Sequence, residues 1–599
     1  MNANSWVRFS GARLNALLSC ATMLGMWWVA ACASSTSSLN MSTAPPSPDP
    51  RVGLQSGRID AGEAAWNMRL ISNRPSFGPF EDALNSDLAF MGNFVFQGNY
   101  NGFIVWDASD PENPTLETSY LCPASQSDVS IFRNLLFVSG ESLGGRADCG
   151  TQGVEEAVSP DRLRGIRVFD ISDVTEPRYI ANVNTCRGSH THTVMTDPRD
   201  DSNVYVYVSG SASVRPPEEL EGCSDLPPEE DPNSSLFRIE VIQVPLDAPE
   251  NARIVSSPRI FTGLDIAPRR AAEIARLLAR GGNALLRLRS GPNQCHDITT
   301  YAAVGLAVGA CQGYGVLLDV SNPAQPRRLY AVADTNFATW HSVTFSNDGQ
   351  GVLLTDEWGG GSGPRCRATD NPVWGGNAIY TIVDQRMEFE SYYKMLAPQT
   401  ETENCVAHNG SLVPVPGRDI KVQGWYQGGI SVFEWTDPKN PVEIAYFDRG
   451  PLIPDTLVMA GSWSAYWYNG YIYSSEIARG LDVFELLPSG HISENELEAA
   501  KTVVFDYLNV QEQQQFVWPP SVPLARAYLD QLQRGNGLAA NRIADVREEL
   551  TRIERLSGQA RAEALRQLAT RLDGDARGAA AAAKVRLLAT AVRDLASAQ

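Results

Sequence analysis

The chain carries the phrase Gly102-Phe-Ile-Val-Trp-Asp-Ala-Ser-Asp-Pro-Glu-Asn-Pro114, in which an apolar run ends at an acidic residue and a turn with two prolines follows. Close copies occupy 165–177, 315–326 and 429–441, and looser copies occupy 237–244 and 480–486. The apolar run is typical of a buried β-strand, and proline suits the turn because it cannot donate to a β-ladder. A unit of this size cannot bury its own faces, so several copies must stack against one another.

Short strand-like runs precede these phrases and predict where each repeat unit begins. The inner strands are expected to start at Ser86, Ser127, His192, His296, His341, His408 and Trp463. Each unit reads as three or four short strands broken by Gly, Asn and Pro, which is typical of all-β folds. The sequence therefore predicts a seven-bladed β-propeller over residues 66–488, closed by pairing of Trp66–Ser72 beside Gly480–Leu486.

The consensus Gly-x-x-Val-x-Asp-x-Ser-Asp-Pro-x-x-Pro resembles the LVIVD-repeat family of secreted bacterial propellers. The resemblance spans about Ser86 to Leu486, and the third and fifth units depart from it because they carry long insertions and no intact turn phrase. It implies a propeller fold and a cell-surface setting. It implies little about activity, since function resides in sites rather than in folds.

Two regions outside the repeats have helical patterns. An insertion at about 262–290 contains the Arg-, Leu- and Ala-rich stretch Ala267–Leu288, which predicts a pair of surface helices. Residues 489–599 begin with Ser493-Glu-Asn-Glu496, which resembles a capping box, and continue with apolar residues at spacings of three and four. We therefore expect a small α-helical appendage, with helices over 522–532, 538–556, 559–572 and 577–598.

The first residues have the pattern of an export signal, because Arg8 and Arg13 accompany one long apolar stretch. The stretch ends in Val29-Ala-Ala-Cys32, which resembles the bacterial lipobox, where cleavage exposes the cysteine for lipidation. Residues 1–31 are predicted to be a lipoprotein signal peptide, and the Ser/Pro-rich residues 32–65 a flexible tether. Ala33 after the cysteine favours outer-membrane anchoring, periplasmic or at the cell surface. In the alternative, cleavage follows a small residue and Cys32 is incidental.

Net charge and cysteine content further restrict the class of protein and the compartment in which it folds. The chain has 69 Asp and Glu against 49 Lys and Arg, a net charge of −20, which argues against a nucleic-acid partner. Eight cysteines lie beyond Cys32, and an even number in an exported chain implies disulfides. If consecutive cysteines pair, each disulfide encloses one loop within or between neighbouring repeats. This predicts the bonds Cys122–Cys149, Cys186–Cys223, Cys295–Cys311 and Cys366–Cys405.

The histidines form the most specific constellation. The chain has only six, and four of them, His192, His296, His341 and His408, fall at the expected starts of consecutive inner strands, near the propeller axis. In the structural interpretation, each imidazole forms a hydrogen bond with a neighbouring blade and so stabilises the circle of blades. In the other they converge on a transition metal, Fe, Zn or Cu, because neutral imidazole is a ligand for these ions. Accessory candidates for the metal reading are His190, Glu357 and Glu476, and Asp297 and Asp356 are further acids that could orient the rings.

Two functions from different classes remain open at this point. The leading expectation is a lipid-anchored surface module that binds a protein or glycan without catalysis. The alternative is a metal-dependent enzyme, most plausibly redox, built on the histidines. An aromatic cluster at 425–426, 463 and 466–468 is expected to be mainly core, with some residues available to a ligand. The glycines at 359–363 indicate a flexible loop, since no Lys-Ser/Thr follows as in a phosphate-binding loop.

Overall fold

A computed structural model describes residues 41–236, 238–281 and 292–598. The expected signal peptide and Cys32 lie outside these described residues, as does the second half of the helix pair expected at 267–288. None of the described helices is long and apolar enough to cross a membrane.

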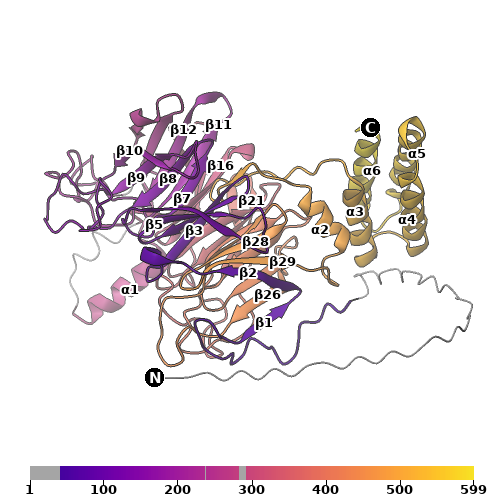
Figure 1. The fold of residues 1–599 in the computed structure, drawn as a ribbon, viewed down its shortest axis with the longest axis horizontal. Coiled ribbons are helices and arrows are strands. Elements are labelled where there is room, and N and C mark those ends of the chain that lie inside the picture. Colours follow the sequence, from indigo (N-terminus) through magenta and orange to yellow (C-terminus); the bar gives the residue numbers. More distant parts are fainter. Residues whose placement is uncertain (1–40, 237, 282–291, 599) are drawn as a thin grey trace, which may run out of the picture. The chain divides into compact units, whose positions relative to one another are not determined.

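Antiparallel meanders follow one another along the chain (Figure 1). Within the described residues, hydrogen bonding joins them into four four-stranded sheets, one five-stranded sheet and one nine-stranded sheet. The five-stranded sheet contains β3 (Asn85–Met91), β4 (Phe94–Asn99), β5 (Gly102–Asp107), β6 (Thr115–Leu121) and the C-terminal strand β30 (Tyr507–Leu508). The next two sheets are β7 (Val129–Phe132), β8 (Leu135–Gly140), β9 (Gly165–Asp170) and β10 (Arg178–Asn184), and then β11 (Thr191–Asp197), β12 (Asp200–Ser209), β13 (Glu240–Pro245) and β14 (Arg253–Ser256). The last two four-stranded sheets are β15 (Cys295–Tyr301), β16 (Leu306–Cys311), β17 (Tyr314–Asp319) and β18 (Arg327–Val332), and then β19 (Trp340–Phe345), β20 (Gly351–Asp356), β21 (Asn377–Val383) and β22 (Arg386–Tyr393).

The nine-stranded sheet joins the last two meanders to the N-terminal strands. Its members are β23 (Asn409–Val413), β24 (Ile420–Gly424), β25 (Ile430–Glu434), β26 (Val442–Arg449), β27 (Ser462–Tyr468), β28 (Tyr471–Glu476), β29 (Gly480–Leu486), β1 (Glu63–Trp66) and β2 (Met68–Arg74). The two meanders meet through a short parallel pair, Asn409 with Ser464 and Gly410 with Ala465. The repeat phrases at 102–107, 165–170, 315–319 and 429–434 supply the third strands β5, β9, β17 and β25.

The fold is mainly β and propeller-like. Strands begin within about two residues of every predicted inner-strand start, from β3 to β27. The expected closure is also present, because β2 pairs with β29 from Met68–Leu486 to Arg74–Leu481, but Trp66 lies in β1 and pairs instead with Tyr446 in β26. Apolar residues of adjoining meanders interdigitate: Phe103, Val105, Ile131 and Phe169 share one buried cluster between the first two. Such burial, on the order of 25 cal/mol per Å² of apolar surface, stabilises a stack that no single unit achieves alone.

All four predicted disulfides are present: Cys122–Cys149, Cys186–Cys223, Cys295–Cys311 and Cys366–Cys405. Each bond closes a loop within or beside one meander, so each restricts the unfolded chain and stabilises the folded one by roughly 3 kcal/mol. Disulfides persist in oxidising compartments, so the four bonds indicate an exported protein.

The segment before β1 packs against the sheets, which shortens the tether expected at 32–65. Arg51 is 2 % exposed, and its guanidinium donates to Glu443 in β26 at 2.9 Å and to Asp49 at 2.8 Å. The guanidinium also stacks 3.7 Å from the ring centroid of Tyr446. The two carboxylates hold the buried arginine in place because their hydrogen bonds replace contacts that its guanidinium would make with water.

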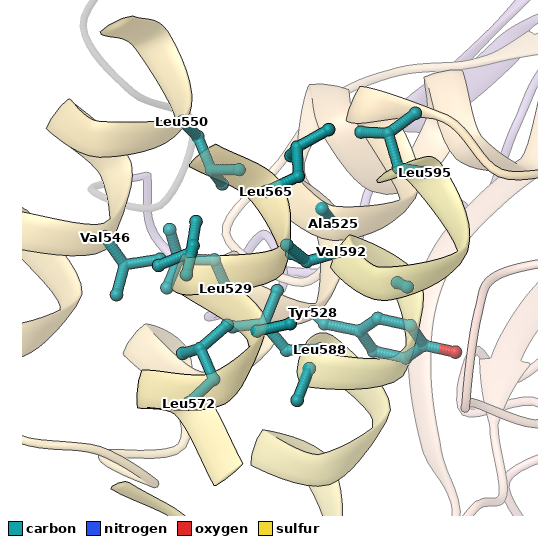
Figure 2. Close-up of a cluster of buried hydrophobic side chains, with 14 of the residues drawn as sticks. Ala525, Tyr528, Leu529, Val546, Leu550, Leu565, Leu572, Leu588, Val592 and Leu595 are labelled. Atoms are coloured by element: carbon teal, nitrogen blue, oxygen red, sulfur yellow. The ribbon is translucent and has the colours of Figure 1, made fainter. Parts of the chain in front are cut away.

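The helices lie in the two regions where the sequence predicts them. The insertion contains α1 (Pro268–Ala279), and the C-terminal region contains α2 (Glu494–Lys501), α3 (Val522–Arg534), α4 (Ala540–Glu554), α5 (Gly558–Asp575) and α6 (Ala582–Ser597). The predicted capping box is present, since Ser493 accepts from the backbone of Glu496 and the Glu496 carboxylate accepts from the backbone of Ser493. Leu529, Val546, Leu550, Leu565 and Val592 meet in one buried core among α3–α6 (Figure 2).

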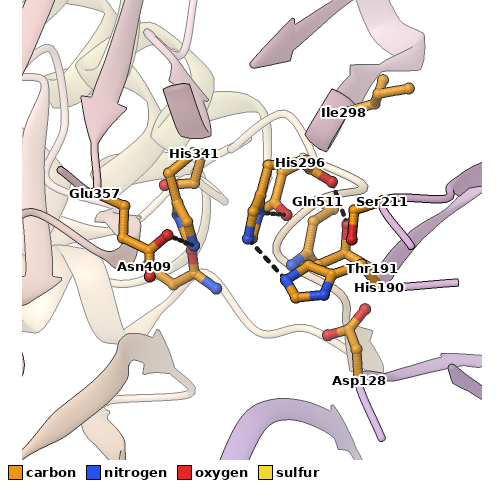
Figure 3. Close-up of polar contacts among 12 residues, drawn as sticks. Asp128, His190, Thr191, Ser211, His296, Ile298, His341, Glu357, Asn409 and Gln511 are labelled. Carbon is orange, nitrogen blue, oxygen red and sulfur yellow. Dashed lines mark hydrogen bonds and ion pairs between the residues drawn. The ribbon is translucent and has the colours of Figure 1, made fainter. Parts of the chain in front are cut away.

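Residues 507–518, which we call the strap, cross the ends of successive inner strands. β30 pairs with Phe90 and Met91 in β3. Further along, the strap forms hydrogen bonds with three later segments, through the pairs Asn509 with Ile131, Gln511 with Thr300, Gln513 with Phe345, and Phe516 with Asn347. These contacts lie near the carboxyl ends of β7, β15 and β19, whereas the histidines lie at the opposite ends of the strands. The strap backbone therefore covers the end of the inner strands that is remote from the histidines, whereas the Gln511 side chain extends toward His296 and donates to Asp87 Oδ2 at 3.1 Å (Figure 3).

The strap contains a buried acid whose ionisation opposes folding. Burial raises the pKa of Glu512 to about 8, more than its hydrogen bonds from Asn509 and Tyr507 lower it. The folded chain therefore holds a proton that the unfolded chain releases near its usual pKa of about 4.3, so stability falls as pH rises from about 5 to 8.

Glu512→Gln removes this titration while keeping the side-chain shape. We expect the variant to gain stability relative to the natural chain as pH rises from 5 to 8, measured as the difference between their thermal unfolding midpoints. A difference that is constant over this pH range would contradict the assignment.

Candidate metal centre

Four imidazoles form a row at the starts of consecutive inner strands, and Figure 3 shows three of them, His190, His296 and His341. Their ring centroids are 4.4 Å apart for His190 and His296, 3.9 Å for His296 and His341, and 4.1 Å for His341 and His408. His296 and His341 lie in β15 and β19, and His190 and His408 directly precede β11 and β23. The meanders bring these strands side by side, so residues more than 200 positions apart in the sequence share one site.

Three of the four rings have their Nδ1 nitrogen fixed by an oxygen acceptor. Nδ1 of His190 lies 2.5 Å from Glu141 Oε1, and Nδ1 of His296 lies 2.9 Å from Asp297 Oδ1. Nδ1 of His408 donates to the backbone carbonyl of Trp463. Each acceptor requires the proton to sit on Nδ1, which leaves Nε2 with a free lone pair when the ring is neutral. The same arrangement orients the histidines of metal sites, where the second nitrogen faces the ion.

The free nitrogens of His190 and His296 point at each other across 2.9 Å (Figure 3). Two lone pairs at this separation would repel, so one Nε2 carries a proton or both face a metal ion. Burial lowers the pKa of His190, but the Glu141 carboxylate outweighs burial and raises it, which favours the proton when no ion is bound. Ligands that share an ion at about 2.0–2.2 Å lie about 3–4 Å from one another, so the separation fits adjacent positions in one coordination shell.

Glu357 adds a carboxylate to the row. His296, His341 and Glu357 each offer a ligand atom within 4.8 Å of the other two. Oε2 of Glu357 lies 4.0 Å from His341 Nε2, and Oε1 lies 3.8 Å from His408 Nε2. Oε1 also accepts a hydrogen bond of 2.6 Å from the Tyr426 hydroxyl. Two imidazoles and one carboxylate with open positions are the donor set of non-haem iron sites, and imidazole also suits zinc and copper.

Burial keeps the deeper imidazoles neutral, which is the form that binds metals. It lowers the pKa of His341 well below its usual value and that of His408 to about 3. Burial also raises the pKa of Glu357, although the charge of His296 and the Tyr426 hydroxyl act in the opposite direction. Nδ1 of His341 and Nε2 of His408 are buried without a hydrogen-bond partner among the described residues. Unsatisfied nitrogens of this kind are costly unless a ligand or ion completes them.

The structure places His192 elsewhere, which corrects the expected ligand set. Nδ1 of His192 lies 2.8 Å from Ser139 Oγ and 3.4 Å from Asp128 Oδ2, and the residue is wholly buried. Thr191 occupies the level of His296, since its hydroxyl donates to the His296 carbonyl at 2.5 Å. His192 lies within β11 and faces the neighbouring meander, whereas His190 precedes the strand, so its side chain does not follow the alternation of the strand and reaches His296. His190, expected only as an accessory, takes its place.

The other acids proposed from sequence have different roles. Glu476 accepts from the backbone of Gly461 at 3.1 Å and from the Arg479 guanidinium at 2.8 Å, so it holds a turn. Asp356 accepts from the backbone of Thr339 at 2.8 Å and from three further amides. Asp297 does orient a ring of the row. Neither Glu476 nor Asp356 has a contact with the imidazoles among the interactions of the described residues.

Two site residues were missed by the sequence reasoning. Glu141 directly follows the second strand β8, just as Glu357 follows the second strand β20, so their shared position was a usable signal. Tyr426 was grouped with the aromatic cluster, and no spacing in the sequence connects it with Glu357. The cluster itself is core as predicted, with Trp425, Tyr466 and Trp467 at most 2 % exposed.

Comparisons with known proteins identify the repeat. The LVIVD repeat family model matches residues 85–122, so the first unit is an LVIVD repeat, as the sequence phrase predicts. Among solved structures, the periplasmic gluconolactonase of Pseudomonas aeruginosa is 11 % identical, with 69 % of this chain and 93 % of that chain covered and a TM-score of 0.41. Hydrazine synthase of Kuenenia stuttgartiensis is also 11 % identical, with coverages of 65 % and 92 % and a TM-score of 0.39. No curated protein matched the chain.

The placement of His192 leads to a test that separates packing from ligation. Burial lowers the pKa of His192 to about 3, so it acts as a neutral core residue. His192→Asn should lower the free energy of unfolding by about 1 kcal/mol, the value of an ordinary hydrogen bond, and leave bound metal per chain unchanged. Denaturant unfolding and elemental analysis measure the two quantities. Loss of metal in this variant without loss of fold would restore His192 to the ligand set.

Proposed function

We propose that this protein is an exported metalloenzyme that holds one transition-metal ion between His296, His341 and Glu357, with His190 and His408 at the two sides of the site. The observation that carries the proposal is that His296, His341 and Glu357 offer ligand atoms that all lie within 4.8 Å of one another. The Nδ1 of His296 faces the Asp297 carboxylate, which leaves its Nε2 available to the ion.

The surroundings of the row support a catalytic rather than a purely structural ion. The side chains of His190 and His296 are 23 % and 18 % exposed, whereas those of His341 and Glu357 are 1 % and 8 % exposed. One edge of the site therefore faces solvent, and the strap covers the opposite ends of the inner strands. Structural metal sites are closed, while catalytic sites keep one position open to water or substrate.

Redox chemistry at iron or copper is the reaction class that we favour. Two imidazoles and a carboxylate leave coordination positions free for an oxidant and a substrate, which is the feature that non-haem iron oxygenases share. When bound, the ion would supply Lewis-acid or electron-transfer chemistry. Glu141 and Asp297 would make the ligand imidazoles more electron-rich through their Nδ1 hydrogen bonds. A purely binding role has no comparable observation in its favour among the described residues, because the aromatic side chains considered for a ligand are buried.

Metal analysis of protein exported without an affinity tag tests the proposal. We expect about one iron, copper or zinc ion per chain in the natural protein. His341→Ala and Glu357→Gln should lose the ion because each removes a ligand, whereas His491→Ala should retain it, since His491 bonds the Thr43 carbonyl outside the row. Thermal unfolding of each variant controls for the fold. A natural chain that stays metal-free after incubation with all three ions would refute the proposal.

We also propose the finer organisation expected from the sequence. The nine-stranded sheet counts as two blades, β23–β26 and β27–β29 with β2, because only one short parallel pair links them; this gives seven blades over residues 66–488, followed by the helical region 489–599. We further propose that Cys32 is lipidated and anchors the protein in the outer membrane, with the segment before Arg51 as the tether. The four disulfides support export, and the lipobox-like residues 29–32 support the anchor.

The anchor can be tested by Cys32→Ala. The substitution removes the only atom of this motif that can carry the lipid, so the protein should leave the membrane fraction or remain uncleaved. Fractionation with mass measurement of the N-terminus decides the outcome. Normal processing together with unchanged membrane association would show that Cys32 is not the anchor.

A further inference from the structure

Tyr426 has a strained backbone that the surrounding residues enforce. Its φ of 54° lies in the left-handed region, which is unfavourable for a bulky residue. Two backbone hydrogen bonds with Ser462, of 3.1 Å and 2.9 Å, hold this conformation. Strain of this kind costs on the order of 1–3 kcal/mol and persists at functional positions where the rest of the structure over-determines it.

The strained conformation directs the side chain to one ligand of the proposed metal site. The Tyr426 hydroxyl donates to Glu357 Oε1 at 2.6 Å, and its ring packs edge-on against the His408 ring at 4.6 Å between centroids. The side chain is buried, with 1 % of the residue exposed.

The glycine loop at 359–363 provides the space for this ring. A Cβ atom on Gly361 would overlap the Tyr426 ring and hydroxyl, whereas a Cβ atom on Gly360 would meet nothing within 4 Å. Both glycines have similar left-handed φ angles, 68° at Gly360 and 64° at Gly361. The two positions therefore share the backbone requirement for glycine, and only Gly361 also makes room for Tyr426.

We infer that Tyr426 is a positioning residue that occupies Glu357 Oε1, so that the carboxylate binds the ion through Oε2 alone and leaves a coordination position open at the exposed edge. This inference rests on the proposed metal site. Carboxylates bind ions through one or both oxygens, and a hydrogen bond to one oxygen favours the other as ligand. Without the hydroxyl, both oxygens can bind and close the open position.

Cobalt(II) is a suitable probe, because its visible absorption weakens as the coordination number rises. The test compares Tyr426→Phe with Tyr466→Phe, whose hydroxyl donates to the buried carboxylate of Asp87 at 2.6 Å. It also compares Gly361→Ala with Gly360→Ala, which introduces the same backbone strain without contact with Tyr426. The second pair keeps the test valid if Tyr426→Phe fails to fold.

We expect Tyr426→Phe and Gly361→Ala to bind cobalt with a weaker visible band than the natural protein, because the freed carboxylate then binds through both oxygens. Tyr466→Phe and Gly360→Ala should match the spectrum of the natural protein. If the natural protein binds cobalt and Tyr426→Phe has the same spectrum, the inference is wrong and the metal site stands. If the natural protein binds no cobalt, the metal site and the inference both fall.

Discussion

Two unprotonated imidazole nitrogens cannot remain 2.9 Å apart without a positive charge between or beside them, and the account of this protein depends on that constraint. His190 and His296 meet in this way because Glu141 and Asp297 each accept a hydrogen bond from the Nδ1–H of one ring, so that the two Nε2 atoms face each other. A shared proton would satisfy this pair alone. A metal ion bound by His296, His341 and Glu357 would also engage Nε2 of His341 and would offset the burial of the Glu357 carboxylate.

The propeller-like stack makes this convergence possible. Each inner strand begins at the same level, so a side chain at the first position of one strand lies beside its equivalents in the next. The stack is held by apolar contacts between meanders, by four disulfides and by the pairing of β2 with β29, none of which involves the histidines. The site can therefore carry costly features, including buried unpaired nitrogens and a left-handed tyrosine, because the stability of the fold comes from elsewhere.

Sequence reasoning reached the fold more reliably than the site. The recurring phrase predicted the third strands, and the even number of cysteines with sequential pairing around loop excursions was enough to pair all eight cysteines. His296, His341 and His408 were also found, because a rare residue recurred at the start of successive units. His192 was misplaced by one residue: the sequence contains His190-Thr-His192, and only the contact of Thr191 with His296 reveals which level each residue occupies. Tyr426 and the strap could not be found, since their contacts join segments that no local pattern relates.

Anomalous X-ray diffraction from crystals of the metal-loaded protein tests the central claim most directly. The account predicts one anomalous peak at about 2.0–2.2 Å from Nε2 of His296, Nε2 of His341 and Oε2 of Glu357, with Oε1 still bonded to Tyr426. A peak at another place, or an empty row in which His190 and His296 share a proton while the crystals contain the metal in solution, would contradict it.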